Sequence, residues 1–171
     1  MAFSSANNNQ KLVRIQKWKP KRSVRETFIP GVWKSTKFFT SRDNIVAGCK
    51  LSQDAIENDI LRKKFKDPRI HFAIICASLG CPPLPRFAYT GENVQAKLDE
   101  QTRKYINSPQ GTRIDRPENT LYLSKLFDWY ADDFKAKSGS VMNFIKPYLA
   151  PEALEFLKQN PKSNTFTITG L

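Results

Sequence analysis

The apolar residues of this chain recur most often at the spacing of an α-helix. Between residues 53 and 64, alanine, isoleucine and leucine side chains fall on one face, which predicts a helix there. Ser52 precedes this stretch and is predicted to cap it, and Pro68 follows it as a stop signal. The same periodicity predicts further helices over 11–17, 90–107, 125–134, 141–149 and 151–159.

Shorter patterns predict strands over 37–40, 45–50, 69–76, 113–115, 120–123 and 164–168. The first two are expected to form a hairpin through the polar residues 41–44, and the fourth and fifth a hairpin around 116–119. The run 69–76 is almost continuously apolar, which is typical of a strand covered on both faces. Helices and strands are mixed irregularly, so we expect one compact α+β domain with a small antiparallel or mixed sheet and packed helices.

The net charge of +12 is concentrated at the start of the chain. Residues 1–50 hold eleven lysines and arginines against two acidic residues, whereas the remainder is nearly balanced. This predicts a basic leader over 1–21 and a domain over 22–171. No nucleic-acid motif accompanies the charge, so a solvated basic face is expected and nucleic acid is not expected as a partner. No apolar run reaches the roughly 20 residues of a membrane span.

The residue types best suited to catalysis lie close together in the middle of the sequence. His71 is the single histidine, and Cys76 and Cys81 follow it by five and ten residues. A thiol becomes a good nucleophile when an imidazole removes its proton, and the imidazole needs an acid or amide to fix its tautomer. With Cys49 the cysteines number three, so they cannot all pair within the chain.

Strand geometry bears on which sulfur serves as nucleophile. In a strand, His71 and Cys76 point to opposite faces and lie about 16 Å apart. Cys81 follows a turn that returns it toward the histidine, so it is preferred, and Cys76 remains the alternative if the strand ends early. Glu57, in the preceding helix, is the preferred acid, and Asp67 is its rival. In this interpretation the candidate catalytic residues are Cys81 or Cys76, His71 and Glu57.

Other interpretations of the same residues are open. His71 and the three cysteines as zinc ligands would match no paired-cysteine metal signature, so no metal or other cofactor is expected. Cys76 and Cys81 are close enough in sequence for a small disulfide across the loop. In the simplest interpretation, Cys76 is a core residue and His71 a buried, hydrogen-bonded one.

Several motifs resemble the bacterial branch of the family known as domain of unknown function 547. They are found at 51–62, 67–73, 76–84, 88–90, 98–102, 123–127, 129–130 and 133–134, and the resemblance covers about 22–150. It implies a divergent relative of papain-like and transglutaminase-like cysteine enzymes, with Glu57, His71 and Cys76 or Cys81 as the catalytic set. Asn58 departs from the pattern, which usually has histidine there, and only residues 7–15 resemble the family's aromatic-rich first helix.

We therefore expect a cysteine hydrolase or acyl-transferase that acts on an amide or peptide-like bond in a peptide substrate. The alternative is a non-catalytic protein-interaction module of the same fold with a decayed site. Many bacterial relatives are exported, but residues 1–9 lack the basic start and apolar stretch of a secretory signal, so a cytoplasmic location is the sequence-based expectation. The sequence indicates no particular oligomeric state.

Overall fold

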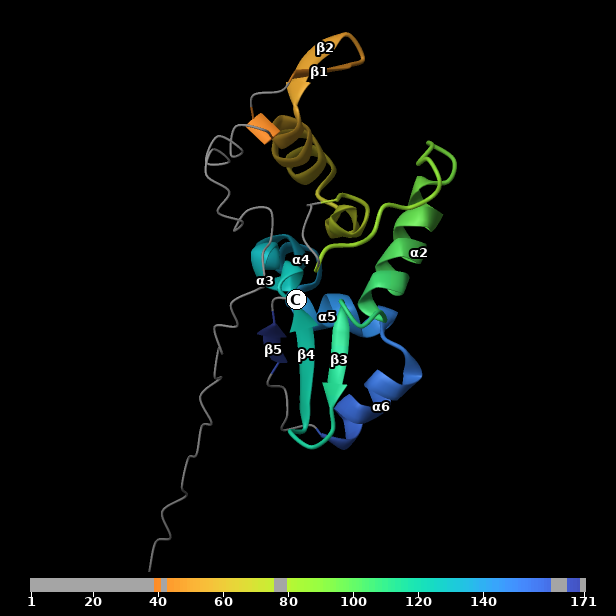
Figure 1. Cartoon of the computed structure of the whole chain (residues 1–171), viewed down its shortest axis with the longest axis vertical. Helices are drawn as coiled ribbons and strands as arrows, with labels where there is room; N and C mark the ends of the chain where they lie inside the picture. Colours follow the sequence, from red (N-terminus) through yellow and green to blue (C-terminus); the bar gives the residue numbers. More distant parts are fainter. Residues whose placement is uncertain (1–38, 41–42, 76–79, 161–165, 170–171) are drawn as a thin grey trace, which may run out of the picture.

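Two small sheets and a series of helices make up the part of the chain that this computed structural model describes, residues 39–40, 43–75, 80–160 and 166–169 (Figure 1). In chain order they are β1 (Asp43–Val46), β2 (Cys49–Ser52), the π-helix η2 (Ala55–Phe65), the 3₁₀-helix η3 (Pro68–Phe72), α2 (Val94–Ile106), β3 (Thr112–Asp115), β4 (Thr120–Ser124), α3 (Leu126–Trp129), α4 (Ala131–Ser138), α5 (Val141–Ile145), the 3₁₀-helix η4 (Lys146–Tyr148), α6 (Pro151–Gln159) and β5 (Phe166–Thr169). The predicted α+β class is confirmed.

The larger sheet has the order β3-β4-β5, with β3 antiparallel and β5 parallel to β4. It is a mixed sheet, one of the two alternatives expected from the sequence, and β5 is the expected last edge strand. The hairpin β1–β2 forms a separate sheet at the other end of the molecule, next to η2 (Figure 1). The predicted helix over 11–17 and the domain boundary at residue 21 lie outside the described residues.

The first hairpin lies later in the chain than predicted. The predicted strand over 37–40 is wrong at residues 39–40, which are helical, and the predicted strand over 45–50 is divided between β1 and β2. Val46 pairs with Cys49, so the turn is Ala47-Gly48 instead of 41–44. Both turn residues have positive φ, 50° and 79°, the conformation of a two-residue turn that matches the twist of the flanking strands. Alanine is uncommon in this conformation, so the composition pointed to the polar residues upstream.

The predicted strand over 69–76 is wrong, because Pro68–Phe72 forms a 3₁₀-helix. Asp67 starts this helix: its carboxylate accepts a hydrogen bond from the backbone N–H of Arg69 at 3.0 Å. The proline then occupies the first turn, where a missing N–H costs nothing. Ile70 and Phe72 are buried, so the apolar run records burial and not strand conformation.

The helices predicted within the described residues are present, but two of them are interrupted. The Ser52 hydroxyl accepts from the Ala55 N–H at 3.1 Å and so caps, as expected, the helical stretch that starts at residue 53 and continues as η2. The helix predicted over 125–134 is two helices, α3 and α4, which meet at Tyr130. The stretch 141–149 likewise divides into α5 and η4.

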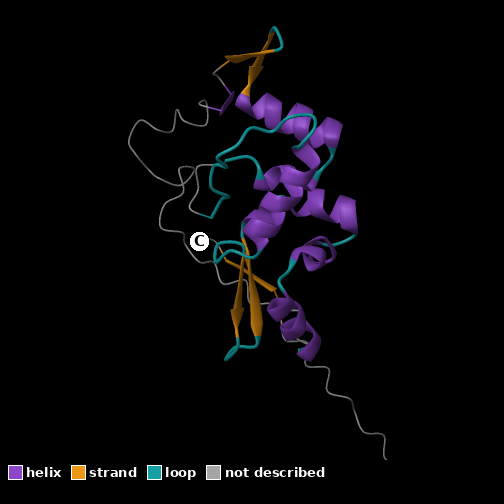
Figure 2. Ribbon diagram, turned by 90° about the vertical axis from the view of Figure 1, so that its right-hand side faces the viewer, coloured by secondary structure: helices purple, strands orange, loops and turns teal. Residues whose placement is uncertain are grey.

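The core lies between the mixed sheet and the helices (Figure 2). Its centre is a group of phenylalanines in which Phe72, Phe127 and Phe134 are fully buried, and the Phe134 and Phe144 ring centroids are 4.8 Å apart. Phe72 anchors η3 in this core, which fixes the position of the adjacent His71. Among the described residues, every helix is too short or too polar to cross a bilayer.

Gly111 provides a test of the close packing where α2 leads into β3. A Cβ at this position would lie 2.0 Å from the backbone oxygen of Tyr105, whereas a Cβ at Gly91 would have no atom within 4 Å. We expect Gly111→Ala to lower the free energy of unfolding by about 2 kcal/mol or more, through backbone displacement. Gly91→Ala is the control, since it restricts the unfolded chain equally. Urea denaturation measures both, and equal effects of the two substitutions would contradict this packing.

Candidate functional site

Six polar side chains from separate motifs converge where η2, η3 and α4 meet. They are Glu57, Asn58 and Arg62 of η2, His71 of η3, Tyr130 at the junction of α3 and α4, and Asp133 of α4. His71 and Asp133, which make the central contact, are 62 positions apart in the sequence. Folding therefore assembles this cluster from the two halves of the chain.

The central interaction joins the histidine to an aspartate. The Nε2 atom of His71 lies 2.8 Å from Oδ2 of Asp133, and the His71 side chain is only 1% exposed. A carboxylate can only accept a hydrogen bond, so Nε2 carries the proton while the histidine is neutral. The lone pair, and with it the basicity of the ring, is then on Nδ1.

Arg62 clamps the same carboxylate with two hydrogen bonds. Its Nε donates to Oδ2 of Asp133 at 2.7 Å and its Nη2 donates to Oδ1 at 3.1 Å, the bidentate geometry that suits a carboxylate. Asn58 orients the guanidinium by accepting from Nη1 at 2.8 Å, and donates in turn to Asp54. The position that departs from the family pattern thus supports the arginine in this chain.

Tyr130 connects Glu57 to the histidine. Its ring stacks on that of His71, with centroids 3.6 Å apart and planes 17° apart, and its hydroxyl donates to Oε1 of Glu57 at 2.9 Å. Glu57 therefore belongs to the cluster, but the carboxylate hydrogen-bonded to His71 is that of Asp133. A catalytic role for Glu57 stays a prediction.

The surroundings set the protonation states of the pair. Burial lowers the pKa of His71, and the hydrogen bond and charge of Asp133 only partly oppose this effect, so the ring favours its neutral form. Burial alone would raise the pKa of Asp133, but hydrogen bonds from Arg62 and His71 outweigh it and keep that pKa below its usual range. At neutral pH the cluster thus holds a neutral imidazole beside an ionised carboxylate.

The cysteines have different environments. Cys81 is buried and disulfide-bonded, while Cys49 is a free, exposed thiol on β2. Cys76 lies outside the described residues. The ring and polar contacts described for His71 are with Asp133, Tyr130 and Phe134, and do not include Cys81.

The conformation at His71 affects which sulfur is the better candidate nucleophile. The preference for Cys81 over Cys76 assumed a strand at His71, and the 3₁₀-helix removes that basis. Both sulfurs therefore remain predictions. Within the described ranges, no three histidine, cysteine, aspartate or glutamate side chains gather as a metal site.

A cavity of about 300 Å³ opens beside the Arg62–Asp133 pair. Arg62 and Asp133 lie on its wall, together with residues of the turn that joins η2 to η3 and with Ala136 of α4. Asp133 is 27% exposed, so the carboxylate touches both the buried imidazole and this open space. Asp133 was not among the residues predicted from the sequence, although it lies in one of the motifs, three positions after Tyr130 in the helix expected over 125–134.

The buried histidine makes the stability of the protein sensitive to acid. The unfolded chain binds a proton at His71 near the ordinary pKa of 6.5, while the folded protein resists protonation to lower pH. The unfolded state therefore binds more protons as pH falls below 6.5, and stability falls too, by up to about 1.4 kcal/mol per pH unit for one proton. We expect His71→Gln to remove this slope between pH 6.5 and 5 in urea denaturation.

Since the chain has one histidine, the comparison isolates that group. An NMR titration of the imidazole in the unmodified protein is the second readout, with an expected midpoint below 6.5. A midpoint above 6.5, or the same pH dependence in both proteins, would contradict the assignment.

Comparison with known proteins identifies the family. The family model described as "Protein of unknown function, DUF547" matches residues 4–106, more than half of the chain. No curated protein and no solved structure matches. The matched range includes Glu57, Arg62 and His71, while Tyr130 and Asp133 lie beyond it. The chain belongs to the DUF547 family.

Proposed function

We propose that this domain is a cysteine-dependent hydrolase or acyl-transferase that acts on an amide or peptide-like bond. The observation that carries the proposal is the His71–Asp133 contact at 2.8 Å, with the carboxylate held by the two hydrogen bonds of Arg62. An acid that fixes the tautomer of an imidazole is the supporting half of a thiol–imidazole–carboxylate site. Kinship with papain-like and transglutaminase-like enzymes of the bacterial branch is part of this proposal.

The chemistry follows from the tautomer. With Nε2–H bound to Asp133, Nδ1 of His71 takes the thiol proton, and the thiolate attacks the carbonyl carbon of the substrate. The imidazolium returns the proton to the departing amine as the C–N bond breaks, which leaves a thioester. Water or an acceptor amine, deprotonated by His71, then releases the acyl group and restores the thiol. Backbone N–H groups near the cysteine would hold the oxyanion.

Each supporting residue has a role in this scheme. Asp133 stabilises the imidazolium, and in the neutral ring it keeps the proton on Nε2. Arg62 keeps the Asp133 pKa low, so the carboxylate stays ionised throughout. Glu57, through Tyr130, holds the aromatic ring flat against the imidazole. The nucleophile is Cys81 or Cys76.

The disulfide of Cys81 sets a condition on this activity. A bonded sulfur cannot act as a nucleophile, so for Cys81 the proposal requires that an external thiol first reduce the bond. Two external thiol groups are consumed: the first forms a mixed disulfide with one protein sulfur, and the second displaces that sulfur as a thiol, so the external pair leaves as a disulfide. Activity is therefore expected only under reducing conditions.

A second candidate function is a non-catalytic protein-interaction module. The observation that favours it is the burial of the His71 side chain, which is 1% exposed. In this interpretation the cluster joins η2 and η3 to α4 as a buried polar network, and the partner is another protein. Substitutions at His71 would then change stability without affecting any turnover.

Thiol labelling tests the proposed nucleophile. We expect iodoacetamide at pH 6, applied to the reduced protein, to modify Cys81 or Cys76 at least about tenfold faster than Cys49. An ordinary thiol with a pKa of about 8.5 is scarcely ionised at this pH, so fast reaction requires activation. Cys49 is the internal reference because it is free and exposed. Mass spectrometry of the digested protein gives the labelling rate of each thiol. Equally slow labelling of all three would contradict the proposed enzymatic function.

Asp133→Asn separates the two candidate functions. We expect it to remove the fast labelling, because an amide can support either imidazole tautomer and does not stabilise the imidazolium. Loss of the paired charge also costs stability, about 1–2 kcal/mol for this partly exposed ion pair. Asp132→Asn is the matched control, since the neighbouring side chain is 98% exposed. A variant that loses stability but labels at the original rate would favour the interaction module.

A further inference from the structure

The second cavity lies between α2 and the loop that carries Cys81, and has a volume of about 330 Å³. Cys81, Pro82 and Pro83 form its loop side. Gln101, Lys104 and Tyr105 lie on its helix side, at the i, i+3, i+4 spacing that places side chains on one helical face. The cavity therefore has one apolar wall and one wall with polar groups.

Gln101 is the unusual residue of this cavity. Only 5% of its surface is exposed, and its side-chain amide makes no hydrogen bond within the described residues. The amide atoms are not among the buried atoms that lack a partner, so the exposed part of this side chain is the part that reaches the cavity. The neighbouring polar groups are satisfied: Thr102 donates to Leu98 at 2.7 Å, and the Tyr105 hydroxyl bonds Ser124 at 2.7 Å. The Gln101 amide faces the cavity without a protein partner, so both its donor and its acceptor are available to a ligand.

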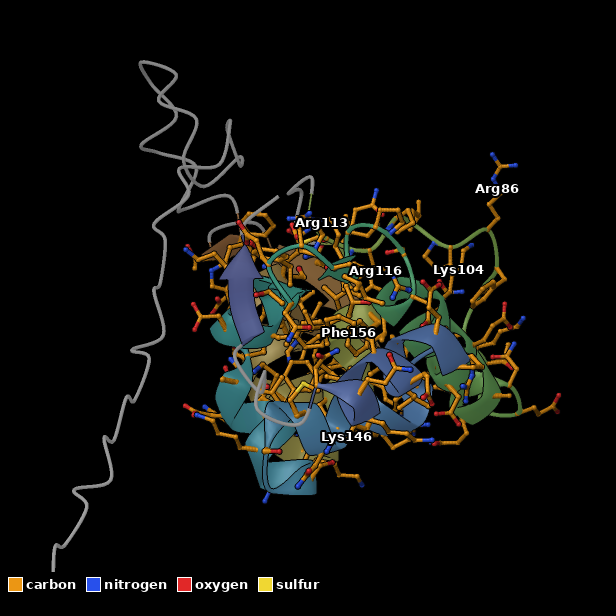
Figure 3. The ribbon with its side chains drawn as sticks, turned by 90° about the horizontal axis from the view of Figure 1, so that it is seen from below. Arg86, Lys104, Arg113, Arg116, Lys146 and Phe156 are labelled. Atoms are coloured by element: carbon orange, nitrogen blue, oxygen red, sulfur yellow. The ribbon has the colours of Figure 1, made fainter. Side chains whose placement is uncertain are left out.

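Lys104 adds a positive charge at the edge of the cavity. It projects from α2, well apart from Lys146 (Figure 3). Within the described ranges Lys104 forms no ion pair, unlike Lys97 about two turns earlier, which pairs with Glu100 at 2.7 Å. The ammonium is thus available for an anion.

We propose that this cavity binds the carboxyl-terminal residue of a peptide. The side chain of Gln101 can donate to a peptide carbonyl and accept from a peptide N–H, and Lys104 can pair with a carboxylate. Cβ atoms three positions apart on a helix are about 5–6 Å apart, which matches a peptide group and the carboxylate of the same residue. Pro82, Pro83 and the Tyr105 ring form an apolar surface for its side chain.

The loop side of the cavity has few backbone N–H donors, which supports this assignment. Proline has no backbone N–H, so Pro82 and Pro83 offer a ligand no backbone donors. Polar recognition therefore depends on the α2 side chains. The Tyr105 hydroxyl donates to the carbonyl of Gly80 and so fixes the loop against the helix, which gives the cavity a preformed shape. This inference concerns binding and does not rest on the proposed catalysis.

Titrations of the full chain, without reductant, test the assignment by NMR. The probes are N-acetyl-glycyl-leucine, its C-terminal amide, and acetate. We expect the free acid to shift the Gln101 side-chain amide resonances and to bind at least about tenfold more tightly than the amide, because a charge-assisted bond to Lys104 is lost in the latter. Acetate alone should bind more weakly than either peptide. Equal affinity of acid and amide, or binding of acetate as tight as that of the free acid, would overturn the proposal.

Variants locate the contacts. Lys104→Met should weaken the free acid about tenfold and leave the amide unchanged, whereas Gln101→Leu should weaken both peptides. Lys146→Met is the control, an exposed lysine on another element. If Gln101→Leu does not fold, Lys104→Met, a substitution at an exposed position, still tests whether the carboxylate binds at this cavity. An equal effect of Lys104→Met and Lys146→Met, or shifts confined to residues outside the cavity, would count against the site.

Discussion

The carboxylate of Asp133 is the group on which the rest of the candidate site depends. It is the acceptor for Arg62 on one side and for His71 on the other, so it fixes a cation and an imidazole at once. Its removal would leave a partly buried arginine without its ion pair and a buried histidine without a defined tautomer. The interaction also joins η2 and η3 to α4, so one contact serves both the chemistry and the packing.

The sequence predicted most elements of the fold because its local signals were strong. The cap at Ser52 and the hairpin of β3 and β4 follow from propensities that act over a few residues. The predicted strand over 69–76 was wrong because burial gives an apolar run in either conformation. Ile70 and Phe72 are apolar because η3 packs in the core, and an apolar run alone cannot distinguish a strand from a buried helical turn.

The candidate site was predicted only in part, for a different physical reason. His71 and Glu57 could be named because their residue types carry chemistry and because they lie near each other in the sequence. Asp133 and His71 are 62 positions apart and come together only when the chain folds. Local sequence spacing therefore cannot predict this contact. The family match ends at residue 106, so two members of the cluster come from the part of the chain beyond it.

The parallel pairing of β5 with β4 has a consequence for how the domain assembles. Leu121 lies opposite Phe166, so the edge of β4 stays open until the intervening helices have formed and the last strand has returned to it. Contacts between residues so distant in sequence form slowly, because a long segment must be ordered before they are made. On the ribosome, this edge would be the final surface of the sheet to be covered, and hence the place where a newly made chain is most exposed to association with another.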